Sequence, residues 1–134
     1  MDKIVLEINS NEFIGLLNNY LSNKYGKKIN VQTKSEFIPG DRPWESDYYH
    51  TEFYYQEEIP ILNYKAKGTT YISDEEIKSI IRELIKVDGY EIINISINTR
   101  REYHECYLSD WYETEFKGVT IDLKSREKKL KLVY

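Results

Sequence analysis

The sequence predicts an α+β domain built from two tandem strand–helix–strand–strand units. An internal repeat and the alternation of helical with extended hydrophobic patterns support this class. The octapeptide Ser-Asp-Tyr-Tyr-His-Thr-Glu-Phe at 46–53 returns at 109–116 as Ser-Asp-Trp-Tyr-Glu-Thr-Glu-Phe, with six of eight positions identical. We therefore expect one pseudo-twofold domain over 1–134, with repeats at about 1–58 and 59–124 and a C-terminal strand at 125–134.

Two helices are expected, near 10–25 and 73–88. Ser10 and Ser73 are candidate N-caps, because a hydroxyl oxygen can accept a hydrogen bond from a free amide of the first turn. Apolar residues spaced by three and four give each helix one buried stripe. Gly26 and Gly89 are expected to end the helices, since glycine adopts the left-handed conformation that follows a helix C-terminus.

Three strands are expected in each unit. One precedes each helix, at 3–8 and about 62–72, and one follows each glycine, near 29–34 and 93–97. Loops near 38–46 and 100–109 lead to the octapeptides, which open the last strands, and Pro60 marks the seam between the units. The simplest assembly is one antiparallel sheet, or two abutting sheets, with both helices on one face.

Composition narrows the functional class. Hydrophobic residues make up 40% of the chain, charged residues 31%, and the net charge is −4, which excludes a disordered chain and disfavours nucleic-acid binding. No apolar run approaches the length of a membrane helix or signal peptide. The single cysteine, Cys106, excludes an internal disulfide. We expect a cytoplasmic protein with no cofactor and no metal.

Catalysis has little support in the sequence. His104 and Cys106 are two residues apart, a spacing at which side chains do not reliably meet, so they do not make a nucleophile and its base. Phosphate-binding glycine motifs and a nucleophile elbow are missing from the sequence. An enzyme would have to depend on His104, Cys106 or Asp110. We therefore expect a protein that binds without catalysing a reaction.

The octapeptides are the most distinctive surface that the sequence offers. Phe53 and Phe116 are expected in the core, and the opposite strand face carries an aromatic residue followed by acids. Such carboxylate rows can imitate a phosphate backbone toward a basic protein groove. An equally weighted alternative is a packing motif with a solvated face. The expected partner-binding residues are Trp44, Glu45, Asp47, Tyr48, Glu52, Tyr54, Glu57, Glu58, Asp110, Trp111, Glu113 and Glu115.

A second hypothesis is a receptor that sequesters a nucleotide or cyclic-nucleotide signal. Its cleft would contain Arg100, Arg101, Trp111 and Tyr112, because bases stack on aromatic rings and arginine binds phosphate with two hydrogen bonds. The first unit has no arginine pair at the matching place, which weighs against this hypothesis. Whether the chain forms a homodimer stays open at this point.

The second unit, with Ser-Asp-Glu-Glu-Ile-Lys-Ser-Ile-Ile, Asp-Gly-Tyr-Glu-Ile and Glu-Phe-Lys-Gly-Val-Thr-Ile over 73–121, resembles small phage-encoded α+β proteins. The resemblance covers less than half of the chain. It implies an accessory protein of a phage or mobile element, of the kind that inhibits host defence, including anti-CRISPR proteins. The expected partner is then a nucleic-acid-handling defence effector of the host, blocked at a basic site.

Overall fold

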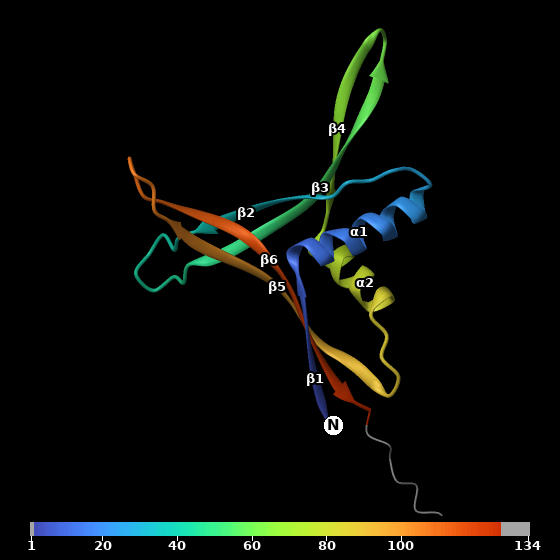
Figure 1. Cartoon of the computed structure of the whole chain (residues 1–134), viewed down its shortest axis with the longest axis vertical. Coiled ribbons are helices and arrows are strands. Elements are labelled where there is room, and N and C mark those ends of the chain that lie inside the picture. Colours follow the sequence, from blue (N-terminus) through green and yellow to red (C-terminus); the bar gives the residue numbers. More distant parts are fainter. Residues whose placement is uncertain (1, 127–134) are drawn as a thin grey trace, which may run out of the picture.

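A computed structural model describes residues 2–126, and within this range the chain forms a mixed α+β fold. The elements follow the order strand, helix, strand, strand, and then the same order again (Figure 1). They are β1 (Lys3–Asn9), α1 (Ser10–Tyr25), β2 (Gln32–Ile38), β3 (Tyr48–Ile61), β4 (Tyr64–Ile72), α2 (Asp74–Leu84), β5 (Tyr90–His104) and β6 (Trp111–Ser125).

The strands form two three-stranded antiparallel sheets rather than one continuous sheet. Their orders are β1–β6–β5 and β2–β3–β4, so each sheet takes one strand from one half of the chain and two from the other. The helices lie side by side, joined by a hydrogen bond of 2.6 Å from the Tyr20 hydroxyl to the Glu83 carboxylate. Neither half can therefore complete a sheet alone.

The core lies where the two sheets meet both helices. Phe13, Phe53 and Phe116 pack edge to face, with ring centroids 5.0–6.0 Å apart, and each comes from a different element. The predicted burial of Phe53 and Phe116 is confirmed. Beside them the buried Thr51 hydroxyl lies 2.7 Å from the Ser35 hydroxyl and 2.5 Å from the Thr99 hydroxyl, which links β3 to both β2 and β5.

The helix ends differ in part from the prediction. Ser73 caps α2 as expected and accepts from the Glu76 amide, but α1 is capped by Asn9 instead of Ser10. Gly26 ends α1 in the left-handed conformation, with φ 67°. In contrast, α2 ends at Leu84, and Gly89, with φ 80°, belongs to the turn that leads into β5.

Two predicted irregular segments are strands in the structure. The expected loop at 100–109 is shorter, because β5 continues through His104. The expected seam at Pro60 is part of β3, which reaches Ile61 before a tight turn into β4. The predicted C-terminal strand lies almost wholly outside the described residues. Over the range that the structure describes, neither helix has the length and apolarity needed to cross a lipid bilayer.

Candidate functional site

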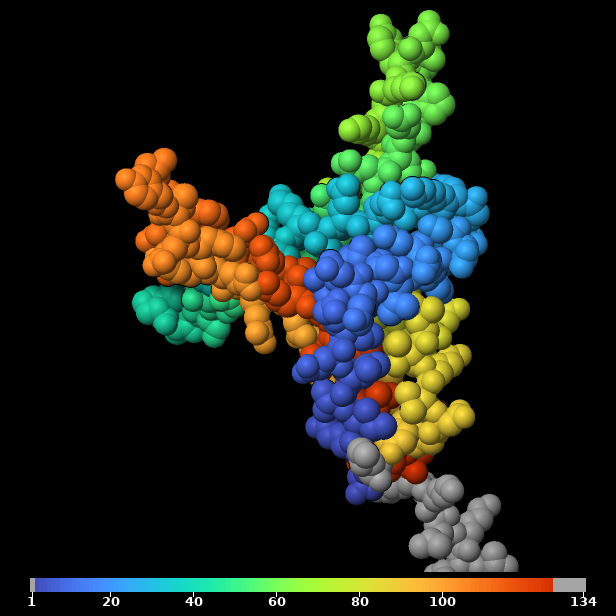
Figure 2. Space-filling model, viewed as in Figure 1, coloured from blue at the N-terminus to red at the C-terminus, as the bar shows by residue number. Residues whose placement is uncertain are grey.

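Two long hairpin ends project from the same side of the body (Figures 1 and 2). One is the end of β2 and β3 with its connecting loop, residues 36–50, and the other is the end of β5 and β6 with its loop, residues 100–113. We call these two segments together the fork. Most of the predicted site residues lie on it, so its geometry decides what the site can do.

Arg101 joins the two halves of the fork. Its guanidinium carbon lies 4.7 Å from the centre of the Phe37 ring on β2 and 4.0 Å from the centre of the Tyr112 ring on β6. The stack extends outward on both sides, because Phe37 packs on Tyr49 at 5.2 Å and Tyr112 on Tyr103 at 5.3 Å. Cation–π contacts of this geometry hold side chains without burying an unpaired charge.

The fork exposes many large side chains. Trp44, at the tip of the first half, is 74% exposed, and the tip of the second half exposes Tyr107 and Leu108 still more fully. Contiguous exposed apolar patches are characteristic of interaction surfaces in proteins. The exposed aromatic and aliphatic residues of the fork are Trp44, Tyr48, Tyr49, Tyr103, Tyr107, Leu108, Trp111 and Tyr112.

The fork also carries the negative charge of the chain. Its two segments contain eight carboxylates and three arginines, a formal charge of −5, whereas the whole chain carries −4. The rest of the molecule is therefore nearly neutral. Such a concentrated charge produces a field that attracts a basic partner over several ångströms of solution.

Several acidic residues that were predicted to bind a partner form hydrogen bonds within the fork. Asp47 accepts a hydrogen bond of 2.8 Å from the Gly40 amide, and Glu45 accepts one of 3.1 Å from the Asp41 amide, so both shape the loop that presents Trp44. A hydrogen bond to the Asp110 carboxylate raises the pKa of Tyr103. These carboxylates remain exposed and can still attract a partner.

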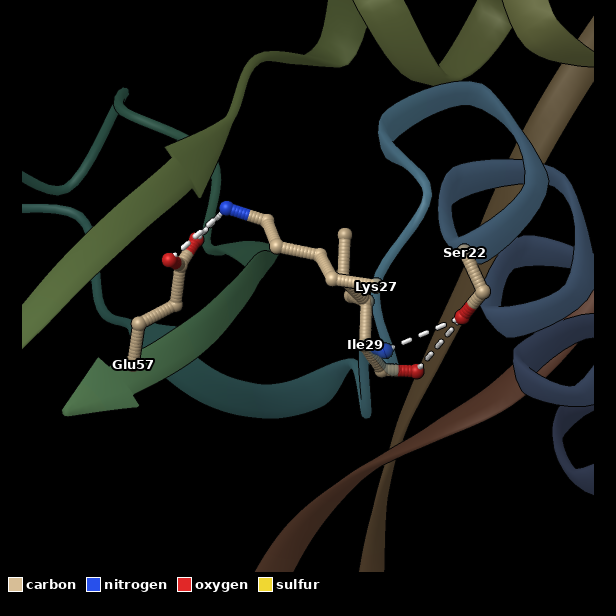
Figure 3. Close-up of polar contacts among 4 residues, drawn as sticks. All are labelled: Ser22, Lys27, Ile29 and Glu57. Carbon is tan, nitrogen blue, oxygen red and sulfur yellow. Dashed lines mark hydrogen bonds and ion pairs between the residues drawn. The ribbon is translucent and has the colours of Figure 1, made fainter.

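The predicted acidic row along 44–58 does not form one surface. Glu57 and Glu58 lie at the far end of β3 from Tyr48, about 30 Å away along a strand of this length. Glu57 is paired there with Lys27 at 2.8 Å (Figure 3), which raises the pKa of that lysine. Tyr54 is half-buried and packs on Tyr71, and Glu52 lies between these two regions.

The arginine cleft of the second hypothesis is not assembled. By strand register, Arg101 and Tyr112 share one face of the β5–β6 hairpin, whereas Arg100 and Trp111 share the other. Trp111 stacks on His104 at 5.2 Å. Arg100 lines a polar groove of about 510 Å³ together with Lys117 and three acids, Glu7, Glu12 and Glu102, so the charge of the groove is net negative and does not favour a phosphate.

The face that carries Arg100 and Trp111 also holds a charged cluster that was not predicted from the sequence. Donor atoms of Glu102, His104 and Glu115 lie within 4.8 Å of one another, a set that suits a divalent metal in principle. The Lys117 ammonium contacts both carboxylates, at 3.0 Å for Glu115, and so lies where a bound cation would lie. This contact lowers the pKa of Glu115 and raises that of Lys117.

The signal for this cluster was present in the alternation Glu102-x-His104 and Glu113-x-Glu115-x-Lys117. It was missed because 100–109 was expected to be a loop, where alternation has no meaning. Glu113 also approaches His104, with 3.2 Å between Oε2 and Nε2. We interpret the cluster as an ion-pair network that stiffens the second half of the fork.

The exposed Cys106 has no catalytic partner among the described residues. Backbone amides of Leu108, Ser109 and Tyr107 lower the pKa of its thiol, but the nearby His104 ring is stacked on Trp111. Nucleophilic catalysis needs a base within hydrogen-bond reach of the thiol.

Comparison of the chain with protein-family models, with curated proteins and with solved structures finds no match. The resemblance to small phage proteins therefore stays a prediction, and function has to be argued from the fork itself.

Proposed function

We propose that this chain is a non-catalytic binding protein that docks the fork onto a basic site of a partner protein and blocks it. One observation carries the proposal: the fork combines the exposed aromatic side chains with a formal charge of −5, while the remainder of the chain is nearly neutral. Tryptophan and tyrosine are enriched among the few residues that dominate binding energy at protein interfaces, and charge complementarity speeds and orients association.

The stiffness of the fork supports the same function. The Arg101 stack and the Lys117 network fix the hairpins before binding, which reduces the conformational entropy lost on docking. The partner that fits best is a protein that handles nucleic acids, because its binding site is basic in order to hold phosphates. An effector of host defence, as expected from the sequence, belongs to this class.

The nucleotide-sequestering alternative has weaker support. Its aromatic and arginine residues are divided between two faces, and the Arg101 guanidinium is already held between two rings. A nucleotide would have to displace Phe37 or Tyr112 in order to reach it.

Quantitative affinity capture from the host tests the docking proposal. Trp44→Ala combined with Tyr107→Ala removes two exposed side chains, so we expect loss of the captured protein with no loss of folding. Tyr71→Ala on β4 removes an exposed aromatic side chain outside the fork, so it is the matched control and should retain the partner. Equal capture by the double variant and by the original chain would refute docking through the fork.

We also infer that the fold is a duplicated strand–helix–strand–strand unit with pseudo-twofold symmetry. The element order supports this, as does the exchange that pairs β1 with β6 and β4 with β3. Phe53 and Phe116, equivalent positions of the two octapeptides, meet at 5.0 Å near the expected axis. Residues 1–62 alone should then form a folded homodimer, in which each copy supplies the strand that the other lacks. A folded monomer of this half would contradict the duplication.

A further inference from the structure

The hairpin of β3 and β4 forms an arm that stands clear of the body (Figures 1 and 2). We use the name arm for residues 56–69, which pair from Gln56 with Thr69 to Ile61 with Tyr64. An isolated two-stranded hairpin is marginally stable in water and needs a packed face for independent stability. The arm therefore needs a surface that packs against one of its faces.

The two faces of the arm differ sharply. One carries Glu58, Pro60, Lys65, Lys67 and Thr69, which are all exposed and mostly polar. The opposite face begins with Glu57 at the base of the arm and is otherwise apolar, with Ile59, Ile61, Tyr64, Ala66 and Gly68. Ile59, Ile61 and Tyr64 are 44%, 54% and 75% exposed.

This apolar face continues the core of the protein. On β3 the same face carries Phe53 and Tyr55, which are buried, before it runs out onto the arm. Nothing among the described residues covers the outer part. A strand face with the apolar pattern of a core strand that nevertheless lies in solvent indicates a surface that is buried in an assembly.

The tip of the arm is also apolar and exposed. Leu62 is 91% exposed and has a φ of 56°, a left-handed conformation that is unfavourable for residues other than glycine, asparagine and aspartate. A bulky apolar side chain at such a position gains nothing within a monomer.

The total surface of the chain points to missing burial. It exposes 10661 Å², whereas a compact monomer of 16.1 kDa exposes about 7,400 Å². The arm, which projects from the body, contributes to this excess, and burial of its apolar face would reduce it (Figure 2).

We propose that the apolar face of the arm is a homodimer interface, in which the arms of two copies pack face to face about a twofold axis. The face is uncharged apart from Glu57 at its base, and Lys27 neutralises Glu57 at 2.8 Å (Figure 3). Two identical copies of such a face can meet without charge repulsion. A charged partner protein would gain no charge complementarity from this face.

The shape of the face suits a copy of itself. Large side chains lie toward the tip, at Ile61, Leu62 and Tyr64, and small ones toward the base, at Ala66 and Gly68. The Ile59 side chain leans over Gly68, where the missing Cβ leaves room for it. A twofold axis across two antiparallel arms places each tip over the base of the other, as an isologous interface requires.

Face-to-face packing is favoured over pairing of strand edges. The arm has two free strand edges. The β4 edge carries Lys65 and Lys67, which would face the same lysines of a second copy in an antiparallel edge pair, and the β3 edge carries Pro60, which cannot donate to a ladder. Lysines on edge strands act against such pairing. The proposed dimer keeps these lysines in solvent and leaves both forks free, so that one dimer presents two docking surfaces.

Sedimentation velocity of the full chain over a range of concentrations tests this interface. The chain should sediment as a species of twice its 16.1 kDa mass. Ile61→Lys places two ammonium groups in the interface and should raise the dimer dissociation constant about a hundredfold or more. Glu58→Lys on the polar face of the same strand, and Leu108→Lys on the fork, should leave the dimer intact.

Two results would overturn the proposal: a chain that stays monomeric at all concentrations, or an Ile61→Lys variant that dimerises as well as the original. If that variant fails to fold, hydrogen–deuterium exchange of the original chain decides instead. Amides of the arm should become more protected as concentration rises, and concentration-independent exchange there would reject the dimer.

Discussion

At the scale of single residues, Gly118 has a conformation that other residues cannot adopt without cost. Its φ is 133°, and a Cβ atom there would lie 2.1 Å from the Ile8 carbonyl oxygen on β1. The position faces Asn9 across the β1–β6 pair and adjoins a register shift between Asn98 and Thr99. Glycine thus permits the close approach of β1 that completes the first sheet.

We expect Gly118→Ala to lower the free energy of unfolding by about 2–4 kcal/mol, because the added methyl clashes with backbone at a left-handed φ. Urea denaturation measures this change. Gly15→Ala is the matched control, since that site in α1 is open and alanine favours helix, so it should add about 0.5–1 kcal/mol. An unchanged midpoint for Gly118→Ala would show that β1 does not approach as closely.

Arg101 is the second residue with an individual role, because it couples β2 to the β5–β6 hairpin. A double-mutant cycle of Arg101→Met and Phe37→Leu should give a coupling energy of about 0.5–2 kcal/mol. The control cycle uses Arg42 and Trp44, whose contact of 5.5 Å lies within one exposed loop and should couple more weakly. Additive effects of the first pair, measured by denaturation, would contradict the stack.

At the scale of elements, the helices and the order of helices and strands along the chain were predictable from local patterns, whereas the pairing of strands into two sheets was not. The stripes containing Phe13, Leu17 and Leu21 and containing Ile77, Ile80 and Ile81 are buried as expected. The N-cap of α1 was predicted one residue late, at Ser10, although Asn9 with Glu12 forms the same kind of cap as Ser73 with Glu76. Capping patterns that overlap in sequence are resolved only by the packing of the neighbouring strand.

Long strands were the element that sequence patterns concealed. The segment at 100–104 carries Arg100, Glu102 and His104 on one face and Arg101 and Tyr103 on the other. Both faces are polar, so the apolar–polar alternation that predicts a strand is missing there. Pro60 suggested a boundary because proline cannot donate to a ladder, yet it lies on the arm, where β3 approaches its turn. The candidate site depends on how far the strands β3 and β5 extend. Because these strand lengths were not predicted, the fork and the Lys117 cluster could not be predicted either.

The Lys117 network should give the β5–β6 hairpin a dependence on pH. A carboxyl whose pKa is lower in the folded chain stabilises the fold above its unfolded pKa, and this stabilisation is lost as pH falls through the folded pKa. Lys117 lowers the pKa of Glu115, so thermal stability should fall between about pH 5 and pH 2. Melting curves of Lys117→Met should show a smaller fall.

Lys67→Met provides the comparison for this pH effect, because Lys67 forms no ion pair among the described residues. That variant should keep the acid dependence of the original chain. If Lys117→Met and Lys67→Met have the same acid dependence, the network does not contribute to stability.

At the scale of the whole molecule, the structure separates two surfaces that the sequence analysis treated as one. The 44–58 segment runs from the fork to the arm, and its acids divide between them. The fork retains the charge and the exposed aromatic residues, whereas the arm is apolar on one face. This division arises because β3 crosses the core, with Phe53 and Tyr55 buried between its two exposed ends.

The central claim is that the fork contacts a partner protein in the cell. A photo-crosslinking amino acid in place of Tyr107, at the exposed tip of the fork, tests it in living cells, because the crosslink captures whichever protein lies against the tip. Tyr71 on β4, also exposed but far from the fork tips, is the matched control position. We predict a covalent adduct with a basic host protein from position 107 and none from position 71. No protein adduct at position 107, or the same adduct from both positions, would contradict the account.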